Sequence, residues 1–125
     1  MWQILFTKGE SKMAMNLLWL KKIDCLVSEE GSADEPYLNF NGKQIWSGDM
    51  YQGDSVNLSH MDPIVFNDTA SLSLWEEDNP GFPFYDNNDH LGTYTVTTAD
   101  APGGVFSVNY SGDGSYTLYM DVVSL

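Results

Sequence analysis

Apolar and polar residues alternate along most of this chain with a period of two, which is typical of β-strands rather than helices. The longest such stretch runs from residue 17 to residue 27. Within it we expect one shared face, interrupted by Lys21, made of Leu17, Trp19, Ile23, Cys25 and Val27. Leu18 and Leu20 leave a short helix as the alternative at the start of this stretch.

Turn residues separate the remaining apolar stretches. Asn41-Gly42 lies between two of them, and this dipeptide favours the type I′ turn of a β-hairpin. The other expected strands cover residues 37–40, 43–46, 55–58, 63–66, 70–75, 91–97, 105–110 and 115–123. Short strands at this spacing, without a convincing helix, predict an all-β fold, an antiparallel β-sandwich of about eight strands.

Length and composition fit one globular domain. The chain has 125 residues, of which 42% are hydrophobic and 14% aromatic, too many for a disordered protein. We expect residues 1–16 to form an N-terminal arm or an extra edge strand, and residues 17–125 to form the sandwich. No signal peptide is evident, and no stretch reaches the roughly 20 apolar residues of a membrane-spanning helix. The localisation stays unknown.

The net charge of the chain limits which classes of ligand the protein can bind. Five lysines, no arginine and 18 acidic residues give a net charge of -13, which argues against binding of nucleic acid. All five lysines precede residue 44, whereas twelve of the acids follow it. The single cysteine, Cys25, cannot form an internal disulfide, and its position on an apolar face predicts a buried, unreactive thiol.

Half of the acidic residues lie in two segments, each at the expected end of a strand. They are Glu29, Glu30, Asp34 and Glu35 in the first segment, and Glu76, Glu77, Asp78, Asp86 and Asp89 in the second. On a strand, Glu76 and Asp78 project to the same side and Glu77 to the other. Two carboxylates about 4 Å apart repel by ~1 kcal/mol in water and by ~4 kcal/mol at an effective dielectric constant of 20.

A divalent cation would relieve that repulsion. The mixture of carboxylate and amide oxygens in residues 86–89 suits Ca²⁺ better than the strict octahedron of Mg²⁺. The residues themselves therefore predict a calcium site. The alternative is a pair of solvated acidic loops that only keep the protein soluble.

Three short motifs resemble the calcium-binding loops of C2 domains. They are Gly-Ser-Ala-Asp-Glu-Pro-Tyr-Leu at residues 31–38, Leu-Trp-Glu-Glu-Asp at 74–78 and Asp-His-Leu-Gly at 89–92. The resemblance covers about residues 17–97 and implies an eight-stranded sandwich that binds calcium at one end, with docking to phospholipid in many members. Carried over, the ligands would be Glu29 or Glu30, Asp34 or Glu35, Glu76 with Asp78, and Asp89. This chain departs from the family pattern by using Glu for Asp at two positions and by a longer loop after Asp78.

We therefore expect a calcium-binding, C2-like interaction module rather than an enzyme. Phe82, Phe84 and Tyr85 are expected to contact a membrane or a protein partner once calcium has neutralised the loops, or else to fold back over Trp75. No arrangement of a nucleophile with a base is evident, and His60 and His90 are expected to be surface residues.

Two other functions stay open. One is a calcium-assisted carbohydrate-binding module that uses Trp46, Trp75 and Tyr51 to hold a glycan. The other is an acidic, self-associating structural domain without a metal.

Overall fold

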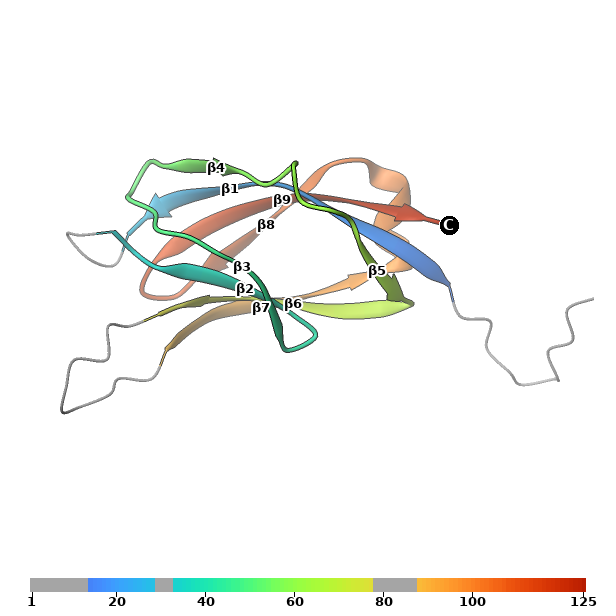
Figure 1. Cartoon of the computed structure of the whole chain (residues 1–125), viewed down its shortest axis with the longest axis horizontal. Coiled ribbons are helices and arrows are strands. Elements are labelled where there is room, and N and C mark those ends of the chain that lie inside the picture. Colours follow the sequence, from blue (N-terminus) through green and yellow to red (C-terminus); the bar gives the residue numbers. More distant parts are fainter. Residues whose placement is uncertain (1–13, 29–32, 78–87) are drawn as a thin grey trace, which may run out of the picture.

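Two antiparallel β-sheets packed face to face form the protein in a computed structural model that describes residues 14–28, 33–77 and 88–125 (Figure 1). The elements are β1 (Met15–Val27), β2 (Pro36–Phe40), β3 (Lys43–Ser47), β4 (Ser55–Asn57), β5 (Ile64–Asn67), β6 (Thr69–Glu76), β7 (Asp89–Thr97), η1 (Thr98–Gly103), β8 (Phe106–Ser111) and β9 (Ser115–Ser124). The predicted antiparallel β-sandwich is confirmed, with nine strands in the described residues.

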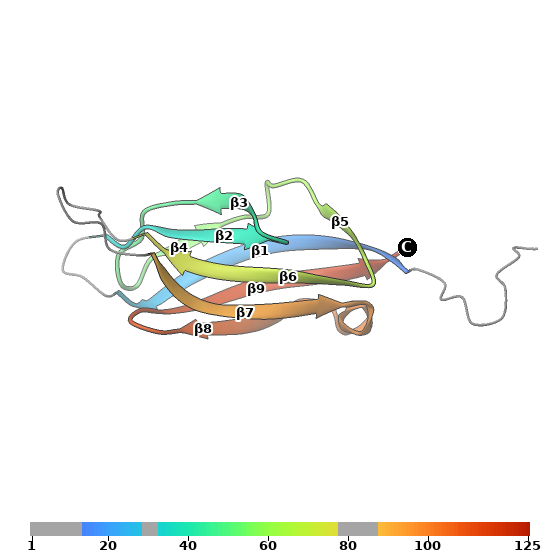
Figure 2. The same cartoon turned by 90° about the horizontal axis from the view of Figure 1, so that it is seen from below.

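The sheets have different strand orders. One has the order β4-β1-β9-β8, with β5 also pairing with the beginning of β1, and the other has the order β3-β2-β6-β7. Figure 2 shows the second sheet in front of the first. The predicted hairpin between β2 and β3 is confirmed, because Asn41 (φ 50°) and Gly42 (φ 83°) both adopt the positive φ that a type I′ turn requires.

The predicted face of β1 is wrong in its first half and at Val27, which is exposed after a second shift of register. Leu18 and Leu20 point into the core in the first half, whereas Ile23 and Cys25 do so further along. The change of parity follows from a β-bulge at Lys21, because Leu20 pairs with Met120 and Lys22 already pairs with Tyr119. Leu17 and Trp19 consequently lie on the outer side of the sheet.

Aliphatic and aromatic side chains from both sheets fill the space between them. Fully buried members of this core include Leu18, Leu38, Leu72, Leu74, Leu118, Met120 and Val122. Tyr110 crosses from β8 to the facing sheet, where its hydroxyl donates a hydrogen bond to the carbonyl of Leu72 (2.9 Å). Burial raises the pKa of Tyr110 well above its ordinary value of 10.

A short 3₁₀ helix, η1, follows β7 and has no counterpart in the sequence prediction. Thr97 caps its first turn, and the carboxylate of Asp100 accepts a hydrogen bond from the backbone N–H of Thr97 (2.9 Å). Six residues, about two turns of a 3₁₀ helix, are too few to show a helical period, so only this capping box could have indicated it. Within the described ranges there is no helix of the length and apolar character needed to cross a membrane.

Candidate functional site

Both acidic segments border the same end of the sandwich. The end of β1 and the start of β2 flank the first segment, and the end of β6 and the start of β7 flank the second (Figures 1 and 2). The register joins them, because Glu76 pairs with Pro36 on one side and with Asp89 on the other. We call this region the acidic end and define it by the described residues Asp34, Glu35, Glu76, Glu77 and Asp89.

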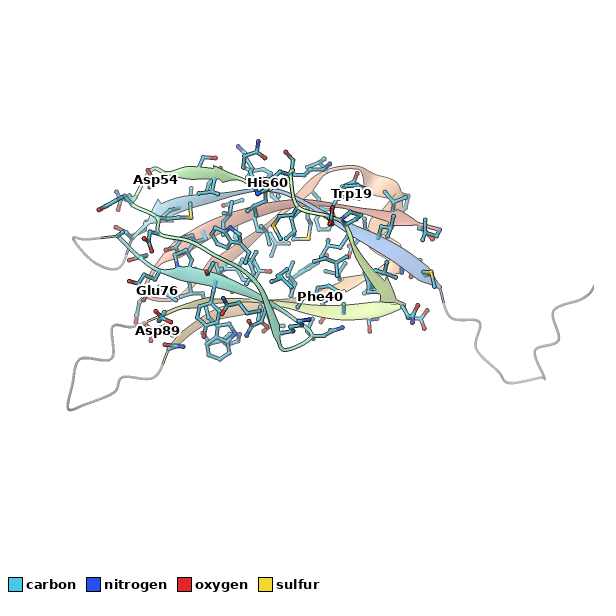
Figure 3. All side chains as sticks on the ribbon, viewed as in Figure 1. Trp19, Phe40, Asp54, His60, Glu76 and Asp89 are labelled. Atoms are coloured by element: carbon cyan, nitrogen blue, oxygen red, sulfur yellow. The ribbon has the colours of Figure 1, made fainter. Side chains whose placement is uncertain are left out.

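Glu76 and Asp89 form the centre of the acidic end. Glu76 continues the inward-facing positions of Leu72 and Leu74, and its side chain is only 2% exposed. It lies directly opposite Asp89 in the β6–β7 ladder, and Figure 3 shows the two side chains close together. Its Oε2 accepts a hydrogen bond from the backbone N–H of Glu35 (3.3 Å). Like charges directly opposite each other on paired strands are unfavourable by up to about 1 kcal/mol.

Asp34 anchors the first acidic segment to the core. Its side chain is completely buried, and its backbone exchanges two hydrogen bonds with Met50 (2.8 and 2.9 Å). The hydroxyl of Tyr116 donates a hydrogen bond to Asp34 Oδ2 (2.7 Å). Burial, and secondly this hydrogen bond, raise the pKa of Tyr116. The Oδ2 atom of Asp34 is therefore engaged inside the protein.

The buried thiol of Cys25 lies near this pair. Burial is the largest cause that raises its pKa above the ordinary value of 9, and the charge of Asp34 acts in the same direction. The expectation that Cys25 is a buried thiol is confirmed, since only 1% of the residue is exposed.

A hollow of about 160 Å³ opens beside the acidic end. Its lining consists of Glu35, Tyr37, Gln44, Ser47, Gly48, Asp49 and Glu77. Asp49 and Gln44 were not singled out in the sequence. The polar turn that follows Trp46 was a signal for Asp49, whereas Gln44 lies in β3. Gly48 makes room for the Trp46 ring, because a Cβ atom there would lie 2.8 Å from it. Three acidic residues, Glu35, Asp49 and Glu77, thus share the lining of one hollow with Tyr37.

Much of the predicted site lies outside the described residues. This applies to the expected calcium ligands Glu29, Glu30, Asp78 and Asp86, and to the expected contact residues Phe82, Phe84 and Tyr85. Among residues 14–28, 33–77 and 88–125, no three His, Cys, Asp or Glu side chains are grouped so as to hold a metal ion. The ligand set as a whole therefore stays a prediction.

Three rings form a row on the outer face of the four-stranded sheet. Tyr37 and Trp75 are nearly parallel with centroids 6.4 Å apart, and the His90 ring lies 4.6 Å from Trp75. Asn88 donates a hydrogen bond to the Tyr37 hydroxyl (2.9 Å). The Trp75 ring thus packs between the rings of Tyr37 and His90, and Asn88 binds the Tyr37 hydroxyl. These contacts within the protein explain the position of the Trp75 ring without a bound sugar.

The other aromatic residues of the carbohydrate hypothesis lie apart from this row. Trp46 is partly buried against the core, whereas Tyr51 is 57% exposed. The carbohydrate-binding alternative stays a prediction. His60 and His90 are exposed, as expected.

The lysines of the described segments lie away from the acidic end. Lys43 is at the opposite end of β2, next to the Asn41-Gly42 turn. Lys21 and Lys22 are in the middle of β1, where Lys22 forms an ion pair with Asp24 (3.5 Å). Positive charge and most of the clustered negative charge are thus separated on this molecule.

Comparison with known proteins returns no matching family model and no matching curated protein. Among solved structures the chain is similar to one described as "Structure of a C2 domain", with 14% identity, a TM-score of 0.48, and coverage of 89% of this chain and 97% of the other. It is also similar to "Structure of Drosophila C2-DSL-EGF1", with 14% identity, a TM-score of 0.40, and coverage of 88% and 67%. Both descriptions contain the name C2.

Proposed function

We propose that the protein is a calcium-binding interaction module whose ion site lies at the acidic end. The observation that carries the proposal is the pairing of Glu76 with Asp89 in the β6–β7 register, with Glu35 tied to Glu76 through its backbone N–H. In this proposal Glu35, which directly precedes β2, Glu76 at the end of β6 and Asp89 at the start of β7 each contribute a carboxylate to the ion site. The acids of the bordering segments, Glu29, Glu30, Asp78 and Asp86, complete the proposed ligand set.

The chemistry of these donors fits calcium. Every proposed ligand is a carboxylate, and hard oxygen donors suit Ca²⁺, which takes six to eight of them in flexible geometry. A structural zinc site would need nitrogen or sulfur donors, and His90 instead lies in the row of rings on the outer face. In this proposal Asp34 positions the first segment through Tyr116, while its neighbour Glu35 supplies the ligand oxygen.

Calcium binding is expected to stabilise the protein strongly. A ligand present at a hundred times its dissociation constant adds about 2.7 kcal/mol to the free energy of unfolding. For a domain of this size such an increment raises the melting temperature by roughly 10 °C. We expect this shift in the wild type, measured by calorimetry with and without calcium, and its loss in the double variants Glu76→Gln/Asp89→Asn and Asp78→Asn/Asp89→Asn.

The matched control is Asp62→Asn, which removes an exposed acid between β4 and β5, outside the acidic end. This variant should keep the full calcium shift. Equal shifts in the wild type and both double variants would contradict the ligand assignment, and no shift in the wild type would contradict the site itself.

Exposed apolar side chains near the acidic end support the proposal that calcium controls docking to another surface. Leu26, Val27 and Tyr51 are each about half exposed, and the turn that follows Tyr51 is hydrogen-bonded to the end of β1 through Gly53 and Cys25 (2.8 Å). Together with Phe82, Phe84 and Tyr85 of the second segment, they would provide an apolar surface. A protein with a net charge of -13 is repelled by anionic lipid. In this proposal, bound calcium offsets the negative charge at the acidic end and so weakens that repulsion.

We therefore expect calcium-dependent docking to a phospholipid surface. In a sedimentation assay with vesicles of phosphatidylserine and phosphatidylcholine, the protein should pellet with calcium and stay in solution with a chelator. Val27→Ser should reduce pelleting without changing the calcium-induced melting shift, because Val27 is not a proposed ligand. Pelleting that ignores calcium would exclude this mode of docking.

A further inference from the structure

A second hollow, of about 600 Å³, crosses the outer face of the other sheet. Lys21 and Lys22 of β1 line it, together with Tyr119 of β9 and Val105, which precedes β8. Ser55 and Asn57 extend it to β4. The hollow therefore reaches from one edge strand of the β4-β1-β9-β8 sheet towards the other, across the strands. It shares no residue with the acidic end.

The β-bulge in β1 places two neighbouring lysines in this hollow. On a regular strand, adjacent side chains point to opposite faces. Here Leu20 and Ile23 both point into the core, and Lys21 is the extra residue between the pairs Leu20–Met120 and Lys22–Tyr119. Lys21 and Lys22 therefore both lie on the outer side, which doubles the positive charge at this point.

Aromatic rings hold both ammonium groups in place. Lys22 Nζ lies 4.6 Å from the centre of the Tyr119 ring, and Lys21 Nζ lies 5.6 Å from that of Trp19, which is labelled in Figure 3. Such cation–π contacts limit the motion of long side chains, so less ordering is required when a ligand binds. Two cations thus face the hollow in a preorganised arrangement.

The charged residues among the described lining of this hollow are both lysines, although the chain as a whole has a net charge of -13. Asp24, which is not among the lining residues, contacts two of them: it forms an ion pair with Lys22 (3.5 Å) and accepts a hydrogen bond from the Ser55 hydroxyl (2.6 Å). Lys21 has no carboxylate within ion-pair distance among the described residues. Apolar surface lies beside the cations, since Val105 is 56% exposed and the Tyr119 ring is partly accessible. The surface therefore complements a ligand that carries negative charge and an apolar group together.

We propose that this hollow binds an acidic peptide segment of a partner protein. Its carboxylates would pair with Lys21 and Lys22, and an apolar side chain would lie on Tyr119 and Val105. A peptide fits better than an extended polyanion, because two ammonium groups without arginine cannot offset the repulsion between nucleic acid or anionic lipid and a protein of this charge. The proposal does not depend on calcium, so it can fail or succeed independently of the function proposed above.

The test uses the full chain and an acetylated hexapeptide of alternating glutamate and leucine, titrated without calcium and followed by amide chemical shifts. A peptide with glutamine in place of glutamate is the matched probe. We expect shifts centred on β1, β4 and β9, with tighter binding of the acidic peptide that weakens as salt rises. Lys21→Gln/Lys22→Gln should raise the dissociation constant about tenfold or more, whereas Lys43→Gln, at the end of a different sheet, should change it less than about twofold.

A second variant covers the case in which the double lysine variant misfolds. Val105→Asp adds a negative charge at an exposed position and removes an apolar contact, so it should weaken the binding of both peptides, and that of the acidic peptide more. Equal affinity for the two peptides, or equal loss in Lys43→Gln, would overturn the proposal.

Three further outcomes would contradict the proposed peptide site. Each would assign the hollow to a different ligand or place the peptide elsewhere on the protein. Shift changes on dilution without peptide would assign the hollow to a second copy of the chain. Calcium-independent pelleting with phosphatidylserine vesicles that depends on Lys21 and Lys22 would assign it to lipid. Shifts confined to the acidic end would place the peptide elsewhere.

Discussion

Replacing Asp34 with alanine is expected to lower the free energy of unfolding by about 3 kcal/mol. The side chain is completely buried and accepts the hydrogen bond of the Tyr116 hydroxyl at 2.7 Å. Without the carboxylate, that hydroxyl is left as a buried donor, which costs about 1–3 kcal/mol, and the packing around the lost atoms adds to it. The space is tight, because a Cβ atom at Gly114 would lie 3.3 Å from Asp34 Oδ2. Urea unfolding measures the change.

A double-mutant cycle separates this hydrogen bond from general packing. Tyr116→Phe removes the donor and keeps the ring, and it should cost about 1.5–3 kcal/mol because the lost bond is to a carboxylate. The double variant Asp34→Ala/Tyr116→Phe should cost less than the sum of the two single variants. Asp49→Ala, an exposed acid next to the Asp34–Met50 bridge, is the control and should change stability by about 0.5 kcal/mol or less. Strict additivity would show that the two residues act separately.

Alkaline pH is expected to destabilise the protein steeply. Burial raises the pKa of Tyr110 and of Tyr116 above the ordinary value of 10, and it raises the pKa of Cys25 above 9. A raised pKa means that the folded state keeps a proton that the unfolded state releases. The stabilisation is complete below the ordinary pKa and is lost as the pH rises above it. Above pH 10, each buried tyrosine should contribute a slope of about 1.4 kcal/mol per pH unit.

Urea unfolding at several pH values between 7 and 11 tests this dependence. The contribution of these groups should be constant from pH 7 to about 9, and stability should then fall. Tyr110→Phe should lower stability at neutral pH through its lost bond to Leu72 and should make the alkaline slope shallower. Tyr51→Phe, at an exposed position, should leave the slope unchanged. An unchanged slope in Tyr110→Phe would show that this tyrosine does not titrate with unfolding.

Local patterns predicted the strands well and the face of β1 poorly. The Asn41-Gly42 turn and the alternation through Ala70, Leu72 and Leu74 depend on neighbouring residues, and the structure has both. The β-bulge at Lys21 depends instead on the register with β9. Because one inserted residue reverses which side chains point inward, a period of two that ignores the bulge assigns half of the strand to the wrong face.

At the acidic end, too, some features could be predicted from the sequence and others depend on the tertiary structure. That the two acidic segments would meet was predicted from their positions at strand ends, and the hydrogen bond from the backbone N–H of Glu35 to Glu76 Oε2 is consistent with it. That Asp34 would be buried against Tyr116, more than eighty residues further along the chain, could not be predicted from composition or spacing. The partner of a buried carboxylate is chosen by the packing of the two sheets.

By itself, the sequence determined the quantities that depend on near neighbours and on summed charge: an antiparallel β-sandwich, its hairpins, a strongly acidic chain and two clusters of carboxylates. Only the tertiary structure decided which acids are buried, that Lys21 and Lys22 share one outer hollow, and which ring lies over which ammonium group. The physical reason is that burial and pairing are set by contacts between strands distant in the chain. Those contacts follow from register, and register becomes definite only when the whole core packs.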